Sequence, residues 1–342
     1  MQKFMRAAVL HQPGDIRVEN VPRPELKPGH ALVRVTACGV CGSDIPRMLS
    51  KGAHKLPVIC GHEFSGRIES IGDGLEQWRE GELVAIPPLI PCFRCTQCLL
   101  GQPSRCEDYD YFGSRRDGAY TEYVSVPASN LLRVPEGSDP TAVALADPAA
   151  IALHAIRKTN LSLGQRIAVV GCGPIGLFAI QWARLIGATE ILAVDVNDRK
   201  IEMAREAGAT RGATDSKSAL GYGSFDVVVE AAGNATAINT AIQLVASGGN
   251  VVFIGIPTVD VPLGLKSFEY FLRQEITLHG CWNSFLAPFP GEEWRLALEH
   301  LANNELRWKF MITHDLDIAE LPKMFEKLRT REEFTAKIIF RA

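Results

Sequence analysis

The first part of the chain alternates short apolar runs with Pro and Gly. Examples are "HALVRVTACGV", "SGRIESIG", "ELVAIPPLI" and "TEYVSVP". This pattern, with turns at short intervals, predicts a β-rich region that extends to about residue 145, and it begins with a strand followed by a turn. Near Ser138 the pattern changes to "DPTAVALADPAAIALHAIRKT", where small apolar residues and Pro140 predict the start of a helix.

From residue 166 onward, strand-like and helix-like segments alternate. "RIAVVGCG" is a short apolar strand, and "PIGLFAIQWARLIGA" has the apolar spacing of a buried helix that ends at Gly187. Alternating strands and helices predict an α/β fold with a parallel sheet covered on both faces. The further predicted elements are strands at 190–196, 225–233, 250–256, 271–282 and 336–342, and helices at 198–209, 235–249 and 292–306.

The composition is that of an ordinary globular protein with room for two domains. The chain has 342 residues, of which 46% are hydrophobic and 22% charged, and its formal net charge is −3. No basic surface is predicted for nucleic acid, and no apolar run approaches the ~20 residues of a membrane span. With no signal-peptide pattern, we expect a cytoplasmic protein whose cysteines bind metal or take part in chemistry.

A dinucleotide-binding fingerprint follows the strand at residue 166. Gly171, Gly173 and Gly176 have the G-x-G-x-x-G spacing, and Asp195 ends the next strand 19 residues after Gly176. The helix N-terminus would bind a pyrophosphate, and Asp195 would accept from the ribose hydroxyls, which favours NAD over NADP. A flavin or S-adenosylmethionine site remains an alternative. The residues expected to bind the cofactor here are Gly171, Gly173, Pro174, Ile175, Gly176, Asp195 and Lys200.

Four of the nine cysteines lie close together, at Cys92, Cys95, Cys98 and Cys106. Four thiolates at this spacing can surround one tetrahedral Zn²⁺, and they leave no position open for a substrate. We therefore predict a structural zinc site. An iron–sulfur cluster, disulfides or free thiols are the alternatives.

A second metal site is predicted from donors that are far apart in the sequence. Cys41 lies in "ACGVCGSD", His62 and Glu63 in "ICGHEFSG", and Asp147 in "ADPAA". A thiolate, an imidazole and a carboxylate form the mixed set that a catalytic zinc binds while it keeps one position open. Because adjacent residues point in different directions, one of His62 and Glu63 would bind the metal directly, or the two would exchange. A redox pair of Cys38 and Cys41 is the alternative.

These motifs together resemble the zinc-dependent medium-chain dehydrogenases, which include alcohol, sorbitol and threonine dehydrogenases. The resemblance covers "VCGSD", "GHEFSG", the four cysteines, "DGAYTEYV", the fingerprint and "AKIIF". Members that act on galactitol 1-phosphate are particularly similar in "CGSDIPRMLSKGAH", "PPLIPCFRC" and "YDYFGSRRDGAYTEY".

The resemblance implies an architecture and an assembly. A GroES-like β-barrel catalytic domain is expected at 1–147, with the structural-zinc lobe at 92–106. A Rossmann NAD-binding domain is expected at 148–281, and residues 282–342 would return to the catalytic domain. Members of the family are usually homodimers or homotetramers, and they bind two zinc ions per subunit.

The resemblance also implies roles for single residues. Ser43 matches the hydroxyl that relays the substrate proton, Glu63 is a candidate catalytic group beside the metal, and His54 is a candidate for the next relay step. Asp147 stands where polyol dehydrogenases commonly have Glu, so it would reach zinc only through water or after the metal moves. The segments expected to line the nicotinamide contribute Ile254, Gly255, Ile256, Trp282 and Asn283.

The implied reaction is the oxidation of a secondary alcohol of a polyol, or of a polyol phosphate such as galactitol 1-phosphate, to the ketone. Zinc would lower the pKa of the substrate hydroxyl, and the alkoxide would transfer hydride to NAD. A phosphate group requires cations, for which the candidates are Arg47, His54, Arg115 and Arg116. The alternatives are an unphosphorylated, sorbitol-like polyol, L-threonine, or a non-catalytic nucleotide-binding or structural member of the family.

Overall fold

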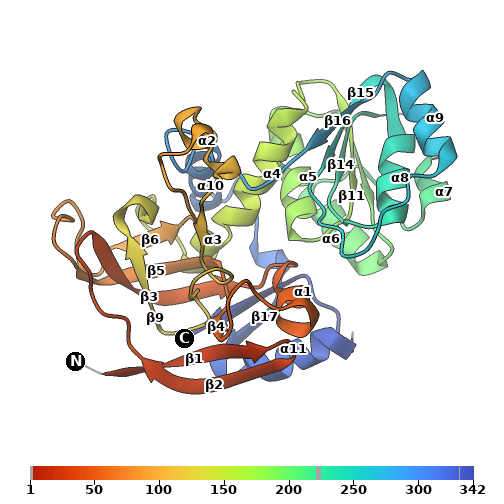
Figure 1. The fold of residues 1–342 in the computed structure, drawn as a ribbon. Helices are drawn as coiled ribbons and strands as arrows, with labels where there is room; N and C mark the ends of the chain where they lie inside the picture. The colour runs from red at the N-terminus through yellow and green to blue at the C-terminus, as the bar shows by residue number, and fades with distance from the viewer. Residues whose placement is uncertain (1–2, 221–224, 331) are drawn as a thin grey trace. The chain divides into compact units, whose positions relative to one another are not determined.

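The computed structural model describes residues 3–220, 225–330 and 332–342. The chain divides into two compact units, each with its own sheets (Figure 1). The first unit contains residues 1–147, 285–308 and 312–342, and the second contains residues 148–284 and 309–311. The first unit is therefore assembled from separate stretches of the chain.

The first unit is built on a three-stranded antiparallel sheet, a seven-stranded sheet that is antiparallel except for the parallel pair β17–β18, and a two-stranded sheet. In one sheet, β1 (Phe4–Gln12) pairs with β2 (Asp15–Pro22) and with β4 (Val58–Ile59). The second sheet has the strand order β10-β6-β5-β3-β18-β17, and β9 also pairs with β3. Its strands are β3 (His30–Gly39), β5 (Glu63–Ile71), β6 (Leu83–Ile86), β9 (Tyr123–Pro127), β10 (Leu132–Arg133), β17 (Ile312–Asp317) and β18 (Lys337–Arg341); β7 (Leu89–Ile90) and β8 (Asp110–Tyr111) pair separately.

Helices in this unit are mostly short and connect or cover the strands. Pro140 is the first residue of α3, as predicted, and the side chain of Asp139 caps that helix by accepting from the Thr141 N–H. The helices are α1 (Asp44–Pro46), α2 (Thr96–Leu99), α3 (Pro140–Ala144), α10 (Glu292–Ala302) and α11 (Leu321–Thr330); single turns are η1 (Arg47–Lys51), η2 (Pro103–Arg105), η3 (Ala128–Asn130) and η5 (Ile318–Glu320).

The core of the first unit explains why distant segments assemble. β1 and β3 contribute runs of buried residues, among them Val9 and Val33, to one hydrophobic cluster that also contains Phe325 of α11 and Phe340 of β18. These side chains are almost completely buried. Because β18 pairs with β3, the sheet is completed by a strand from the far end of the sequence.

The second unit is a six-stranded parallel sheet with the order β13-β12-β11-β14-β15-β16. Its apolar strands carry helices on both faces, which confirms the predicted parallel sheet (Figure 1). The strands are β11 (Arg166–Val170), β12 (Glu190–Val194), β13 (Arg211–Ala213), β14 (Phe225–Glu230), β15 (Val245–Phe253) and β16 (Thr277–Gly280); the helices are α4 (Ala146–Lys158), α5 (Pro174–Ile186), α6 (Asp198–Ala207), α7 (Ser216–Leu220), α8 (Ala235–Leu244), α9 (Leu265–Arg273) and η4 (Lys309–Met311).

Several predicted elements differ in extent from the observed ones, and two of them change type over part of their length. The helix expected at 235–249 ends at Leu244, because Val245–Phe253 forms β15 and Val245 pairs with Phe225. The strand expected at 271–282 is only β16, since α9 includes 271–273. The apolar residues Leu265, Phe268 and Leu272 follow helical spacing, and this pattern identifies α9. Among the described residues, no helix is long and apolar enough to cross a membrane.

Candidate functional site

Three neighbouring strands bring the predicted donors of the second metal site together. Cys41 follows β3, and Glu63 is the first residue of β5. In the β3–β5 ladder Gly39 lies opposite Glu63, and in the β3–β18 ladder Gly39 lies opposite Ile339. Strand pairing therefore places the end of β3 beside the starts of β5 and β18.

The donor atoms of Cys41, His62 and Glu63 all lie within 4.8 Å of one another. A thiolate, an imidazole and a carboxylate at this spacing suit a zinc ion, so the residues fit the metal that the motifs imply. His62 and Glu63 are both buried. Because each contributes a donor atom to this group, the geometry does not choose between one direct ligand and an exchange of the two, and this point stays a prediction.

Lys337, the first residue of β18, is a site residue that the sequence analysis missed. Its side chain is fully buried, and Nζ donates to the Val40 carbonyl at 2.9 Å and to Glu63 Oε2. A buried lysine requires such partners, because burial disfavours the charged form. The available signal was a charged residue at the start of the apolar run "AKIIF".

Asp44 is a second missed residue, and it lies behind the metal donors. Its buried carboxylate accepts from the Cys41 N–H at 3.1 Å, from the Tyr120 hydroxyl at 2.9 Å and from Arg47. Burial alone would raise the pKa of Asp44, but the charge of His62, together with that of Arg47, lowers the pKa well below its usual range. Asp44 Oδ1 also lies 3.4 Å from His62 Nδ1, so the two groups attract each other when the ring is charged, although Nδ1 makes no hydrogen bond among the described residues.

Asp147 lies in the first turn of α4 and is buried. It does not belong to the group of three whose donor atoms lie within 4.8 Å of one another. Its Oδ1 has no hydrogen-bond partner. Burial, with a contribution from Glu63, raises the pKa of Asp147 to about 7, although His62 and Lys337 act in the opposite direction.

The predicted proton relay and phosphate site share one arginine. Ser43 precedes α1, and its Oγ accepts from the Arg47 guanidinium at 3.4 Å. His54 is exposed, and its pKa is lowered by burial of part of the ring and by the charges of Arg115 and Arg47. The structure therefore brings Arg47, His54 and Arg115 near one another. Arg116 instead pairs with Asp110 at 3.2 Å.

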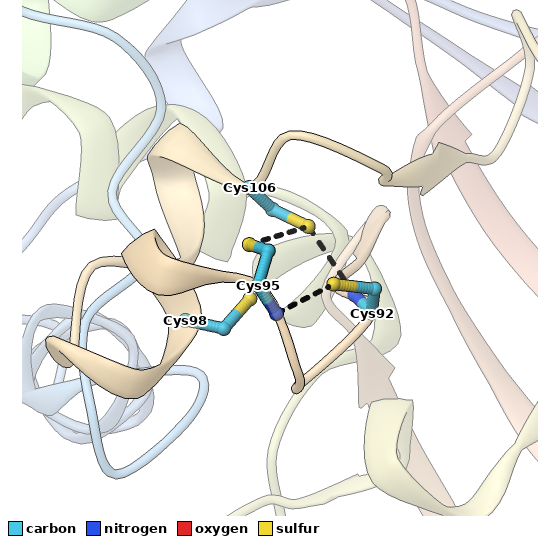
Figure 2. Close-up of side chains that lie close together, drawn as sticks. All are labelled: Cys92, Cys95, Cys98 and Cys106. Carbon is cyan, nitrogen blue, oxygen red and sulfur yellow. Dashed lines mark hydrogen bonds between the residues drawn. The ribbon is translucent and has the colours of Figure 1, made fainter.

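The four sulfur atoms of Cys92, Cys95, Cys98 and Cys106 lie within 4.8 Å of one another (Figure 2). The Cys95 N–H donates to Cys92 Sγ, and the Cys92 N–H donates to Cys106 Sγ, each at 3.3 Å. Backbone donors from Glu107 and Cys98 lower the pKa of Cys95 to about 6. Sulfurs that receive backbone N–H groups and converge on one point fit a closed tetrathiolate zinc site.

The fingerprint of the second unit has the backbone geometry that its motif requires. Gly171 follows β11 with a φ of 99°, and Gly173 precedes α5, whose first residues are Pro174 and Ile175. A Cβ on Gly176 would lie 2.0 Å from the Gly171 carbonyl oxygen, so this contact needs glycine. In contrast, a Cβ on Gly173 would meet no protein atom within 4 Å, which leaves this side of the turn open.

Asp195 lies beside the fingerprint, as its spacing predicts. Its Oδ2 accepts from the Cys172 N–H at 2.9 Å, and Lys200 Nζ lies 3.9 Å away. The other expected cofactor residues follow β15 and β16, at the same edge of the sheet. Ile256 and Trp282 are exposed, while Asn283 has a φ of 54° and a buried Nδ2 without a hydrogen-bond partner. Ile254 and Gly255 are partly buried.

This combination of a metal-donor set and a dinucleotide fold defines an oxidoreductase that acts on alcohols. The model of the alcohol dehydrogenase GroES-like domain matches residues 27–136, and that of the zinc-binding dehydrogenases matches residues 174–303. The chain belongs to the family of zinc-binding alcohol dehydrogenases, with a GroES-like domain followed by a Rossmann-type domain.

Similar proteins extend over nearly the full length of the chain. Galactitol 1-phosphate 5-dehydrogenase of Escherichia coli is 33% identical over 91% of this chain and 92% of its own. L-threonine 3-dehydrogenase of Bacillus licheniformis is 31% identical over 94% and 95%. The crystal structure of galactitol-1-phosphate dehydrogenase from Escherichia coli superposes with a TM-score of 0.94, at 30% identity over 99% and 100% of the chains. A zinc-binding dehydrogenase from Sinorhizobium meliloti bound to NADP gives a TM-score of 0.90 at 30% identity over 100% of both chains.

Proposed function

We propose that the protein oxidises a secondary alcohol of a polyol phosphate, of the galactitol 1-phosphate kind, to the ketone with NAD. The observation that carries this proposal is the group of Cys41, His62 and Glu63, whose donor atoms lie within 4.8 Å of one another. The charges of His62, Glu63 and Lys337 act on Asp147, so its carboxylate completes the polar surroundings of the proposed metal. The similar galactitol 1-phosphate dehydrogenase supports the choice of substrate.

Bound at these residues, zinc would supply a Lewis acid that makes the substrate hydroxyl more acidic. The chain's own groups then move the proton. Ser43 Oγ already accepts from Arg47, so its own O–H is free to pass a proton on. Arg47 cannot take that proton, because a guanidinium stays charged in proteins. His54 is the proposed acceptor, since its lowered pKa keeps the ring neutral near pH 7.

Arg115, Arg47 and His54 form the proposed phosphate subsite. Both arginines act electrostatically on His54, which supports a shared positive region in the first unit. The Arg115 guanidinium lies 4.5 Å from the centre of the Tyr109 ring, and this contact leaves its N–H edge available for an anion. Arg116 is a weaker candidate because its guanidinium is paired with Asp110. Arg47 is likewise paired, with Asp44, so Arg115 carries most of the proposed phosphate recognition.

Steady-state rates on galactitol 1-phosphate, galactitol, sorbitol and L-threonine, each with NAD and NADP, test the proposal on zinc-loaded enzyme. We expect galactitol 1-phosphate with NAD to give the highest kcat/KM. Arg115→Ala should raise KM for the phosphate ester roughly tenfold, which corresponds to ~1.4 kcal/mol, and change KM for galactitol little.

Arg94→Ala is the matched control, because Arg94 is an exposed arginine paired with Asp108 in the four-cysteine lobe. It should leave both KM values unchanged. Equal rates on galactitol and its phosphate would contradict the phosphate subsite. They would favour the sorbitol-like or threonine-like alternative, and L-threonine and sorbitol dehydrogenases are also similar to this chain.

The preference for NAD rests on Asp195. A ribose hydroxyl can donate to its carboxylate, whereas a 2′-phosphate would be repelled by the same charge. A similar zinc-binding dehydrogenase from Sinorhizobium meliloti has been crystallised with NADP bound, so both cofactors are included in the test. A higher kcat/KM with NADP than with NAD would contradict this part of the proposal.

We also propose that the protein forms a homodimer or homotetramer and binds two zinc ions per subunit. Support for association comes from the exposed apolar residues Leu265, Phe268 and Leu272 of α9, and separately from the edge strand β16 with its exposed Leu278. Light scattering coupled to gel filtration measures the assembly. A monomer at micromolar concentration would contradict it.

A further inference from the structure

Glu230 is a buried carboxylate at the point where the strand order of the second unit reverses. From β11 the chain moves outward through β12 and β13, and it then returns to β14 on the other side of β11. Ligands of such sheets bind outside the carboxyl ends of the strands at this switch point. Glu230 is the last residue of β14 and is completely buried.

The sheet order indicates which half of a dinucleotide lies near Glu230. The pyrophosphate belongs at the N-terminus of α5, directly after β11. Asp195, after β12, takes the adenosine ribose on one side of that point. The nicotinamide half must then extend to the other side, over the ends of β14 and β15. This step rests on the proposed use of a nicotinamide dinucleotide.

Glu230 holds the two turns that end these strands. Its Oε1 accepts from the Ala232 N–H at 2.9 Å and from the Gly233 N–H at 2.7 Å. Its main-chain carbonyl accepts from the Ile254 N–H at 2.8 Å and from the Gly255 N–H at 3.2 Å. One residue thus fixes the turn at 231–233 and the turn at 254–256.

The two turns pack with little space between their backbones. A Cβ on Gly255 would lie 2.2 Å from the Gly233 nitrogen and 2.8 Å from Glu230 Oε2. A Cβ on Gly171, in the fingerprint, would lie 2.8 Å from the Ala232 nitrogen. Movement of the 231–233 turn would therefore disturb both the fingerprint and the turn at 254–256.

The state of the second carboxylate oxygen supports a positioning role. Oε2 is buried and has no hydrogen-bond partner. Burying a carboxylate oxygen without a hydrogen-bond partner costs free energy. Burial raises the pKa of Glu230, although the hydrogen bonds from the Gly233 and Ala232 N–H groups oppose that rise. An apolar side chain would be enough to fill this space. The presence of a carboxylate is explained by Oε1, which accepts from two backbone N–H groups.

We propose that Glu230 is a positioning residue for the nicotinamide half of the cofactor. It does not touch the reacting atoms. It turns the N–H groups of residues 232 and 233 inward and so sets the path of the two turns that face the nicotinamide ring.

The test compares two ligands that differ only in the nicotinamide. Dissociation constants of NADH and ADP-ribose are measured by calorimetry for the wild type, Glu230→Ala and Glu230→Gln. We expect Glu230→Ala to weaken NADH binding roughly tenfold and ADP-ribose binding less than about twofold. Glu230→Gln keeps an oxygen acceptor, so it should restore most of the affinity for NADH and the KM for NAD.

Asp226→Ala is the matched control. Asp226 is near the other end of β14, and its Oδ2 accepts from the Arg166 N–H at 2.7 Å. Its loss should lower the melting temperature and leave the ratio of the two dissociation constants unchanged.

Two results would overturn the proposal: equal weakening of NADH and ADP-ribose in Glu230→Ala, or a Glu230→Gln variant as weak as Glu230→Ala. A wild type that binds neither NADH nor NADPH would instead overturn the proposed function. If the wild type prefers NADPH, the two ligands become NADPH and 2′-phospho-ADP-ribose. The ratio of their dissociation constants in each variant then decides the role of Glu230.

Discussion

Lys337 is a charged residue in a buried strand, and it balances the carboxylate of Glu63. Both side chains are buried, and Nζ has the Val40 carbonyl as its other partner. A buried pair of this kind is costly to break, because the remaining charge loses its counterion while it stays out of water.

Lys337→Met should therefore lower the free energy of unfolding by ~3–5 kcal/mol, measured by urea denaturation. Lys327→Met is the control, since Lys327 makes the same type of pair, with Glu333, at the surface. We expect little change there. A similar small change in Lys337→Met would show that the buried pair does not stabilise the fold.

The two cysteines of "ACGVCGSD" differ in their surroundings, which answers whether they are a redox pair. Cys41 belongs to a group of possible metal donors, whereas Cys38 does not. Cys38 is buried, and burial raises its pKa well above the usual value, so its thiol is a poor nucleophile.

Cys41→Ser should abolish dehydrogenase activity and lower the zinc content by about one ion per chain. Cys38→Ser should retain both. The measurements are initial rates and metal analysis of the purified variants. Loss of activity in Cys38→Ser with full zinc content would revive the redox interpretation.

At the scale of elements, Gly173 and Gly176 in the turn from β11 to α5 differ in what a side chain would meet at each position. Gly176 is needed by the protein itself, since its Cα faces the Gly171 carbonyl. Gly173 faces open space, so the fold itself does not require glycine there, and we predict that this space admits the proposed cofactor.

Gly176→Ala should destabilise the second unit by ~1–3 kcal/mol or more, because backbone atoms must move apart. Gly173→Ala should leave the melting temperature nearly unchanged and weaken NADH binding by roughly tenfold or more, the equivalent of ~1.4 kcal/mol. Thermal unfolding and NADH titration measure the two effects. Wild-type affinity for NADH in the Gly173→Ala variant would contradict a close approach of a cofactor phosphate to the backbone at residue 173.

The lobe of four cysteines has little secondary structure of its own. Only α2 and the single turn η2 lie between Cys92 and Cys106. Sulfur atoms within 4.8 Å of one another need a cation to hold them as thiolates.

Cys98→Ser should lower the zinc content by about one ion per chain and expose the lobe to proteolysis between residues 92 and 106. Cys281→Ser, a change outside both groups of possible metal donors, should keep the zinc content. The checks are metal analysis and mass spectrometry of the protease fragments. An unchanged zinc content in Cys98→Ser would contradict a structural metal there.

At the scale of the whole molecule, the sequence predicts the parts that depend on local patterns. The strand and helix at residues 166–186, the helix start at Pro140 and the cap at Gly187 follow from apolar spacing and special residues. The donors Cys41, His62 and Glu63 were identified by type and neighbourhood, and the structure brings them together.

What the sequence did not reveal depends on contacts between distant segments. Lys337 and Asp44 were missed, since their roles arise only when β18 pairs with β3 and when α1 folds behind His62. Glu230 lay inside the strand predicted at 225–233, and the role proposed for it depends on contacts with turns that follow separate strands. A contact between side chains that are far apart in the sequence leaves no local sequence pattern from which it could be predicted.

The pairing of β18 with β3 has a consequence for how the protein is made. Glu63 and Lys337 are 274 residues apart, and a ribosome synthesises Glu63 long before Lys337. Residues 148–284 form one continuous stretch of the second unit, so that stretch can fold while synthesis continues. The first unit lacks the strand that pairs with β3 and the lysine that pairs with Glu63 until residues 337–341 leave the ribosome. We therefore expect the proposed metal site at Cys41, His62 and Glu63 to reach its final geometry only after Lys337 has been synthesised.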